Sequence, residues 1–481
     1  MRTRNLHSLE FSNLRTVAAA TLATVLTAAL AACGGSNGTS TTQPPVTAQK
    51  TSVQVNIGDA PSDWMLAFSM NISSMSLTGS NGSAAVVSTS VPVEMMHLMG
   101  MMQPLNMVNA PQGTYTAASI TIGSATVMYM DPTTKAAVQK TISGPISATV
   151  SFGTPVTVGS TPMAMGFDLD LSKSVTMDSG GNMAMNPVFH VTSGMQGSGN
   201  PMDPSNGGIQ EMMGAVSSVS GSSFGMMSMQ AAQSLTFATN SSTVFEGTSM
   251  SGMNNGMLLI VDATLQSDGS LMATKVQSMM NSAGVMGGGV ITAVTGQPPT
   301  SLTMVMQNGA GSGMMSSAFA AGVTIDMNGS TTYEIDQDNM DMSSLPFTPA
   351  FDSSNIHAGQ SVMPISSSAM MAGGMGGGMM GGGNMAGTIT ATGVELEPQG
   401  ISGTVATAIT SGGQTSFTMA LPTGCAFYTL TGATSVTIYQ QPKTVISTGS
   451  SIASGSTVHA FGLMFFDNGQ WKMVASRLGS N

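Results

Sequence analysis

One short segment indicates the fold class of this chain: Thr51-Ser52-Val53-Gln54-Val55-Asn56-Ile57-Gly58-Asp59-Ala60-Pro61. Val53, Val55 and Ile57 are apolar, whereas the residues between them are polar. This alternation predicts a β-strand with one buried and one wet face, because successive side chains of a strand point to opposite faces. The stretch ends in residue types that favour turns, so the strand is expected to stop there.

Segments of the same kind continue to residue 193. Phe68, Met70 and Ile72 alternate with polar residues, and the alternation resumes on a shifted phase at Met75, which predicts a bulge near Ser73-Ser74. Further predicted strands cover residues 115–122, 146–152, 165–171 and 187–192. Many short strands separated by turn residues predict a β-sandwich.

Three motifs in this region resemble an uncharacterised domain that is common at the N-terminus of bacterial lipoproteins. They are Val55-Asn56-Ile57-Gly58-Asp59-Ala60-Pro61, Pro111-Gln112-Gly113-Thr114-Tyr115 and Phe167-Asp168-Leu169-Asp170-Leu171. The resemblance covers residues 51–193 and implies a β domain of unknown function, with no catalytic residues to carry over from the family.

A linker rich in Gly, Ser, Pro and Asn at 194–208 precedes three copies of one weak pattern. The shared features are an opening glycine (Gly214, Gly289, Gly403), a Thr-x-Phe/Tyr element (243–245, 331–333, 437–439) and a second glycine (Gly256, Gly359, Gly455). The copies predict β modules at 209–281, 285–397 and 400–479. They resemble a second uncharacterised family of small barrel-like modules that occur in tandem. Asp268-Gly269 and Asn468-Gly469 predict hairpin turns, and a Gly/Met-rich tract at 370–386 in the second copy is expected to be a mobile loop.

The N-terminus has the pattern of an export signal. Arginines precede an apolar segment, Val17 to Leu30, that is too short to span a bilayer. Leu30-Ala31-Ala32-Cys33 resembles the lipobox of bacterial lipoproteins, which implies a signal peptide at 1–32, lipidation of Cys33 and acylation of the new amino terminus. An ordinary signal peptide with a chance cysteine is the alternative. Residues 33–50 are expected to form a flexible tether.

The composition of the chain disfavours one class of function, nucleic-acid binding. Only 7% of residues are charged, and the net charge is −11. Nucleic-acid binding needs clustered Lys and Arg, so no nucleic-acid partner is expected. The second of two cysteines, Cys425, has no disulfide partner once Cys33 is lipidated, and the sequence predicts a small buried side chain within a strand.

Several motifs resemble known kinds of site but lack residues that those sites need. The pattern G-x-S-x-G at 221–225 lacks the helix that a hydrolase elbow needs. The acidic run at 336–341 lacks the glycine and the bidentate glutamate of an EF-hand, so a solvated loop is expected. Asp168 and Asp170 share one strand face, which we interpret as the wet face of a sheet. No His or Cys spacing fits zinc.

Methionine is the residue type that still suggests a site, because it accounts for 48 of the 481 residues. One segment gathers the candidate soft-metal ligands Met95, Met96, His97, Met99, Met101 and Met102. Thioether and imidazole groups suit Cu(I), and thioethers also react reversibly with oxidants. The alternative is that methionine replaces Leu and Ile as a flexible core residue, as expected for Met70 and Met165.

The sequence therefore predicts an all-β protein, a β-sandwich followed by about three small β-barrel-like modules. The leading hypothesis is a non-enzymatic envelope lipoprotein, held to the membrane by its lipid, that serves binding, adhesion or scaffolding toward an unknown protein or glycan partner. The resemblance to bacterial lipoproteins favours the outer membrane, because Gly34 follows the cysteine where an aspartate in that family would hint at retention in the inner membrane. No cofactor is expected, unless the methionine cluster binds copper or buffers oxidants, which is the second hypothesis. An envelope hydrolase is the third.

Overall fold

The computed structural model describes residues 49–60, 62–98, 101–197, 203–228, 234–279, 288–307, 323–337, 340–366, 389–411, 414–446 and 452–480. The predictions for Cys33, the signal peptide, nearly all of the tether and the Gly/Met tract at 370–386 lie outside these residues. Residues Ala48–Asn481 form one compact unit.

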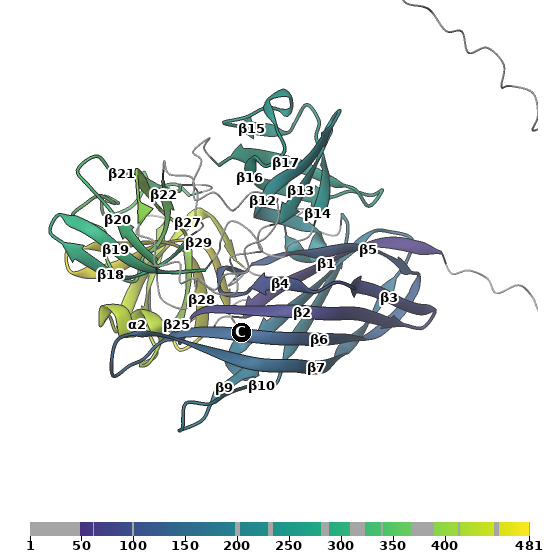
Figure 1. Cartoon of the computed structure of the whole chain (residues 1–481), viewed down its shortest axis with the longest axis horizontal. Helices are drawn as coiled ribbons and strands as arrows, with labels where there is room; N and C mark the ends of the chain where they lie inside the picture. Colours follow the sequence, from purple (N-terminus) through teal and green to yellow (C-terminus); the bar gives the residue numbers. More distant parts are fainter. Residues whose placement is uncertain are drawn as a thin grey trace, which may run out of the picture. The chain divides into compact units, whose positions relative to one another are not determined.

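Two sheets packed on one core make up the first part of the chain (Figure 1). Its elements are β1 (Lys50–Ala60), β2 (Met65–Gly79), β3 (Gly82–Val87), β4 (Val91–Glu94), η1 (Met96–Leu98), β5 (Met102–Pro111), β6 (Gly113–Met130), β7 (Ala137–Val158), β8 (Met163–Asp170), α1 (Leu171–Ser174), β9 (Val175–Met177), β10 (Met183–Met185) and β11 (Phe189–Met195). One sheet has the order β11-β8-β1-β5, the other β3-β2-β6-β7 with β4 beside β2, and β9 and β10 form a small hairpin. The predicted sandwich is confirmed.

The alternating residues of β1 and β2 form the core between the sheets. Val53, Val55 and Phe68 are fully buried, and Met70 and Met165 are buried core residues as expected. The register of β2 against β6 shifts between Ile72 and Ser74, which confirms the predicted bulge. The bulge keeps the apolar side chains on the core face after the phase of the sequence changes.

The prediction of a wet outer face on β1 is wrong. Gln54 and Asn56 are both fully buried. The Asn56 amide donates to the carbonyl oxygen of Pro204 at 2.9 Å, and Gln54 donates to the Asn56 side chain at 2.9 Å. The short helix η2 (Pro204–Asn206), which follows the sandwich in the chain, therefore contacts this face at Asn56.

Three β modules follow in the chain. The first has β12 (Gly208–Ser220), β13 (Ser223–Ser228), β14 (Ser234–Ala238), β15 (Val244–Glu246), η3 (Met250–Gly252), β16 (Leu258–Leu265) and β17 (Leu271–Ser278). The second has β18 (Gly289–Gly296), β19 (Pro299–Met306), β20 (Val323–Asp326), β21 (Thr332–Ile335), β22 (Ser361–Ile365), β23 (Ile389–Thr390) and β24 (Gly393–Leu396). The third has β25 (Gln399–Ser411), β26 (Gln414–Ala420), α2 (Ala426–Thr431), β27 (Ser435–Ile446), β28 (Thr457–Asp467) and β29 (Gln470–Ser480).

All three modules use the same strand pairing. In the third, five strands form a closed barrel in the order β25-β26-β27-β29-β28. In the first, β14 pairs with β17, which closes the ring β12-β13-β14-β17-β16. In the second, β23 and β24 share the role of the closing strand, pairing with β20 and β22 respectively. The predicted all-β class with about three barrel-like modules is confirmed.

In each module, the hydroxyl of one threonine connects the closing strand to the turn that directly precedes this threonine. Its hydroxyl accepts a backbone N–H three residues earlier and donates to an alanine carbonyl of the closing strand. The pairs are Thr243 with Ala273, Thr331 with Ala391, and Thr444 with Ala475. The prediction that Thr437 begins the third copy of this element is therefore wrong, because Thr444 makes these contacts.

The second glycine of the repeated pattern has the same conformation and the same kind of contact in all three modules. Gly256, Gly359 and Gly455 have positive φ, and each donates its N–H to the carbonyl of a residue in the first strand of its module. The predicted Asp268-Gly269 and Asn468-Gly469 turns also have left-handed glycines, as short hairpin turns require. Among the described residues, no helix has the length and apolar character needed to cross a bilayer.

Candidate functional site

A cavity of about 130 Å³ lies where the sandwich and the three modules meet. Several hydrogen bonds hold the surrounding segments together. The Gln307 amide donates to the Leu66 carbonyl at 2.7 Å, and the Ala426 N–H donates to the Asp63 carbonyl at 2.6 Å. The Gln399 amide joins the second and third modules by donating to the Gly359 carbonyl at 2.9 Å. The cavity is therefore a product of the tertiary structure rather than of any one module.

One wall of the cavity carries a carboxyl and a hydroxyl group, those of Asp63 and Ser402, and the hydroxyl contacts the imidazole of His459, which is not a lining residue. Ser402 and His459 are directly opposite each other on β25 and β28, and the Ser402 hydroxyl lies 2.7 Å from His459 Nδ1. Burial raises the pKa of Asp63, while its hydrogen bonds with Ser402 and the nearby His459 lower it. Hydrolytic triads place the histidine between the serine and the acid. Here the acid contacts the serine instead of the far side of the imidazole, so the order of the three groups differs from that of a triad.

Cys425 lines the cavity beside this group. The sequence predicted a buried residue in a strand, and Cys425 is buried and free, but the strand assignment is wrong. It is the N-cap of α2, where its sulfur accepts the Tyr428 N–H at 3.2 Å, and Gly432 ends the helix in a left-handed conformation. Burial raises the pKa of the thiol, so it is protonated at neutral pH.

Two buried polar atoms of the lining have no hydrogen-bond partner within the described structure. They are the hydroxyl of Ser62, which is fully buried, and Oε1 of Gln103, which is 2% exposed. An unsatisfied buried polar atom costs about 1–3 kcal/mol, so such atoms in a cavity wall are expected to meet a ligand or an ordered water.

Glu211 reaches the cavity from a distorted part of β12. The register of β12 against β16 is irregular between Ile209 and Met212, and Glu211 has a φ of 51°. Its N–H donates to the Asp262 carboxylate at 2.7 Å, which holds the backbone in this conformation. A non-glycine residue in this region is strained, and such strain is concentrated at binding and catalytic sites.

Of the six predicted copper ligands, the structure describes the side chains of Met95, Met96, Met101 and Met102. Met95 and Met96 are buried in the sandwich core, whereas Met101 and Met102 are half-buried beyond η1. Met96 and Met101 line the cavity. Met99 and the side chain of His97 lie outside the described residues. The described residues contain no cluster of three His, Cys, Asp or Glu side chains that fits a metal ion.

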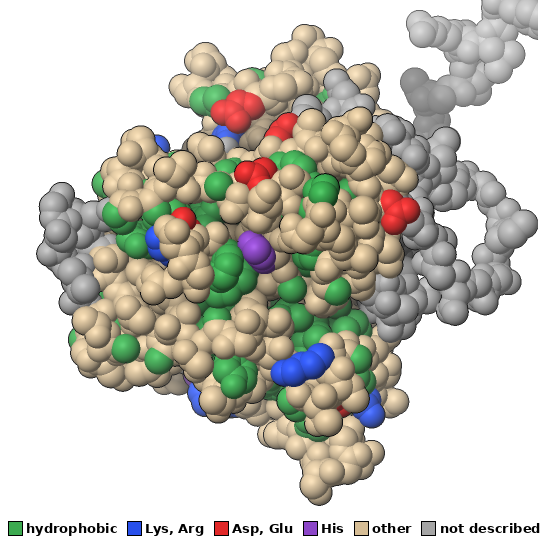
Figure 2. Space-filling model, turned by 90° about the vertical axis from the view of Figure 1, so that its left-hand side faces the viewer, with side chains coloured by type: hydrophobic (Ala, Val, Ile, Leu, Met, Phe, Trp, Pro, Cys, Tyr) green, Lys and Arg blue, Asp and Glu red, His purple; other side chains and the backbone are tan. Residues whose placement is uncertain are grey.

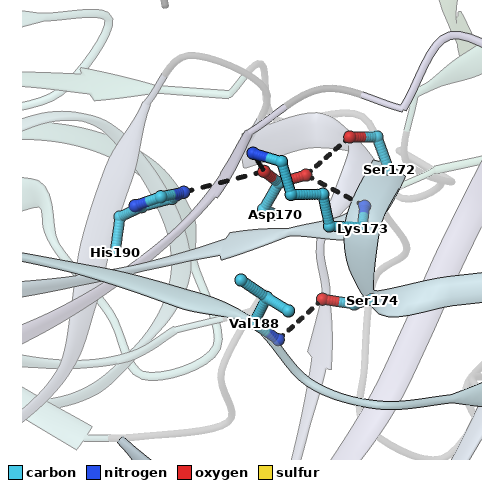
Figure 3. Close-up of polar contacts among 6 residues, drawn as sticks. All are labelled: Asp170, Ser172, Lys173, Ser174, Val188 and His190. Carbon is cyan, nitrogen blue, oxygen red and sulfur yellow. Dashed lines mark hydrogen bonds and ion pairs between the residues drawn. The ribbon is translucent and has the colours of Figure 1, made fainter. Parts of the chain in front are cut away.

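The interpretation of Asp168 and Asp170 as a wet face is wrong. Asp170 is 4% exposed and caps α1, accepting the Lys173 N–H at 3.1 Å and the Ser172 hydroxyl at 2.6 Å (Figure 3). Lys173 Nζ and His190 Nε2 lie 2.6 and 3.6 Å from its other oxygen. Burial raises the pKa of Asp170, but these hydrogen bonds and the lysine charge outweigh it, so the net shift is downward. Asp170 therefore stabilises the end of β8.

Other motifs that the sequence suggested do not meet in a site. The segment at 221–225 joins β12 to β13 in a tight turn with no helix after it. In the acidic run, Asp341 is exposed and accepts from Ser343, Asp336 lines the cavity, and Asp338 lies outside the described residues.

Sequence reasoning missed the cavity residues. Asp63, Ser402 and His459 are far apart in the chain, and no local spacing connects them. The only local signal was the turn Pro422-Thr423-Gly424 before Cys425, which favours a helix start over a continuing strand.

Comparison with known families matches one segment. Residues 213–277, which span most of the first module, match a domain of unknown function (DUF5666). The comparison with curated proteins gives no match.

Proposed function

We propose that this chain is a lipid-anchored envelope protein whose β modules have a non-enzymatic binding role. The observation that carries the proposal is the cavity at the module junction. Its lining combines apolar side chains with a few polar groups, two of which have no hydrogen-bond partner within the described structure. Concave sites with this composition are the usual places where small molecules bind. We place the protein at the outer membrane, by the sequence argument at Cys33.

The surface is consistent with a small neutral or polar partner rather than a polyanion. Figure 2 shows one face on which charged side chains are few and scattered among neutral ones. The low charge of the whole sequence supports the same proposal, since nucleic acids are recognised through clustered cations.

Native mass spectrometry tests the binding role. The full chain is extracted in a non-ionic detergent and incubated with small-molecule extract of the envelope. We expect an added mass that is released when the protein unfolds. Absence of any added mass on the folded chain would contradict a small-molecule binding role.

If Cys33 carries the lipid anchor, the Cys33→Ala variant is expected to leave the membrane fraction completely. Wild-type protein is expected in the membrane fraction, with an intact mass equal to the chain from Cys33 plus acyl groups. The variant cannot form the thioether and should lose this mass and the membrane association. Cys425→Ala is the matched control and should keep both. A wild-type mass that begins at Met1 would refute the anchor.

Copper binding is the second candidate, and one observation favours it. Met65, Met96, Met101 and Met213 line the same cavity as Cys425. Thioethers suit Cu(I) without losing a proton, so they would serve as ligands while the thiol stays protonated. Titration with Cu(I) under reducing conditions, in competition with a chelator, should show binding that Met101→Ala weakens. Met177→Leu changes an exposed methionine and serves as control. Complete retention of Cu(I) by the chelator would exclude this candidate.

A further inference from the structure

We propose that a cluster of three methionines, contributed by the first and second modules, binds one Cu(I) ion. The cluster consists of Met213, Met279 and Met363, whose buried side chains contact one another. Of these three, only Met213 also lines the junction cavity. The site therefore differs from the cavity site considered above for copper, and the experiment below distinguishes the two.

The methionines of this cluster lie outside the cores of their modules. Met212 belongs to the core of the first module and Val362 to the core of the second. Because neighbouring residues of a strand point to opposite faces, Met213 on β12 and Met363 on β22 point away from these cores. Met279 directly follows β17. The three side chains therefore meet where a strand of the second module packs on the outer face of the first.

The buried part of the cluster is methionine alone. Within the described part of the chain, Leu258 and Ile260 of β16 pack against it and are themselves only partly buried. Leucine would provide the same apolar contact with a smaller loss of rotamer freedom than methionine, so packing does not require sulfur at three positions. The property that distinguishes the three side chains from leucine is the thioether group.

Three thioethers match the ligand preference of Cu(I). Soft sulfur ligands suit Cu(I), whereas Ca²⁺ and Mg²⁺ take oxygen ligands and Zn²⁺ takes thiolate, imidazole or carboxylate groups. A thioether has no proton to lose, so it binds the metal without a change of protonation. Its sulfur is an acceptor with two lone pairs, so a hydrogen bond to the sulfur of Met213 leaves one lone pair for the ion.

The burial of the cluster suits a metal ion that arrives from solvent. Met213, Met279 and Met363 are 8%, 7% and 6% exposed. The remaining contact with solvent allows the ion to enter without the unfolding of a module, while burial limits the water that competes for coordination. Coordination by the three sulfurs offsets the cost of placing a positive charge in this apolar environment. A bound ion would also join the first module to β22 of the second.

Competition with a Cu(I) chelator tests the proposal. The full chain in non-ionic detergent is titrated with Cu(I) under anaerobic, reducing conditions, and the copper retained per chain is measured. We expect Met363→Leu and Met279→Leu each to retain one copper ion fewer per chain than the wild type. Leucine keeps the volume and the apolar contact, so both variants should fold. Equal copper content of the wild type and Met363→Leu would overturn the proposal.

Two further variants locate the loss of copper. Met226→Leu is the matched control, because Met226 is fully buried in the core of the first module, and its copper content should equal that of the wild type. Met101→Ala separates the cluster from the cavity. Loss of copper in Met101→Ala but not in Met363→Leu would leave the cavity candidate standing and refute the cluster. Complete retention of Cu(I) by the chelator would exclude both, while the binding of a small molecule in the cavity would be unaffected.

Discussion

Gly289→Ala is expected to lower the free energy of unfolding by about 3 kcal/mol, the upper part of the range for overpacked sites. A Cβ atom on Gly289 would lie 2.2 Å from the Val305 carbonyl oxygen and 2.8 Å from the Met306 Cα. Both are backbone atoms of the neighbouring strand β19, so neither can move away without breaking the sheet register. The module must therefore distort to accept the methyl group.

The same close approach occurs at the opening glycine of the other modules. A Cβ would lie 2.5 Å from the Met227 oxygen at Gly214 and 2.4 Å from the Ala420 oxygen at Gly403. Calorimetric unfolding of the three alanine variants should show comparable losses. Gly153→Ala is the control, because no atom lies within 4 Å of its Cβ position, and it should be neutral or slightly stabilising. Equal stability of Gly289→Ala and Gly153→Ala would refute the steric argument.

Asp168→Asn is expected to stabilise the protein at pH 8 by up to about 3 kcal/mol and to have little effect at pH 4. Burial raises the pKa of Asp168 from 3.8 to about 6; the His190 charge lowers it and the Asp170 charge adds to the rise. The folded state therefore holds the Asp168 proton more tightly than the unfolded state. The contribution of Asp168 to the free energy of unfolding is fully favourable below pH 3.8 and is lost as the pH rises through about 6. The neutral amide removes this dependence.

Urea unfolding of both proteins at pH 4 and pH 8 measures the difference. Asp178→Asn is the control, because the pKa of Asp178 is shifted in the opposite direction to that of Asp168. The Asn182 side chain and backbone N–H groups bond the Asp178 carboxylate and lower its pKa, so its amide variant should not gain stability at pH 8. A gain in Asp168→Asn that is the same at both pH values would show that the effect is not protonation.

Local patterns were sufficient for the strands and their turns. The alternation in β1, the bulge in β2 and the Asn468-Gly469 turn each depend on residues within a few positions of one another. The physical reason is that side-chain alternation and left-handed turn conformations are properties of the local backbone. The same holds for the recurring glycines, whose spacing reflects one strand order used three times.

Local patterns failed where a distant segment covers a residue. The alternation predicts that Gln54 and Asn56 face water, but both are buried, and Asn56 bonds Pro204 of η2. Asp170 was expected to face solvent, and it caps α1 instead. The Thr-x-Phe/Tyr pattern predicts Thr437 as the repeated threonine, yet Thr444 bonds the closing strand. For Asn56 and Thr444 the deciding contact joins segments far apart in the sequence, whereas Asp170 caps the helix that directly follows it.

The amino-acid order alone was enough to assign the all-β class and the repeated modules, because backbone geometry and side-chain periodicity act over short distances. The cavity with Asp63, Gln103, Glu211 and Ser402 exists only after the sandwich and the modules pack together. Burial then removes water from these polar groups, which raises the pKa of Asp63 and leaves the Gln103 oxygen without a partner in the described structure. Desolvation of this kind depends on the surrounding atoms in three dimensions, and no pattern of neighbouring residues encodes it.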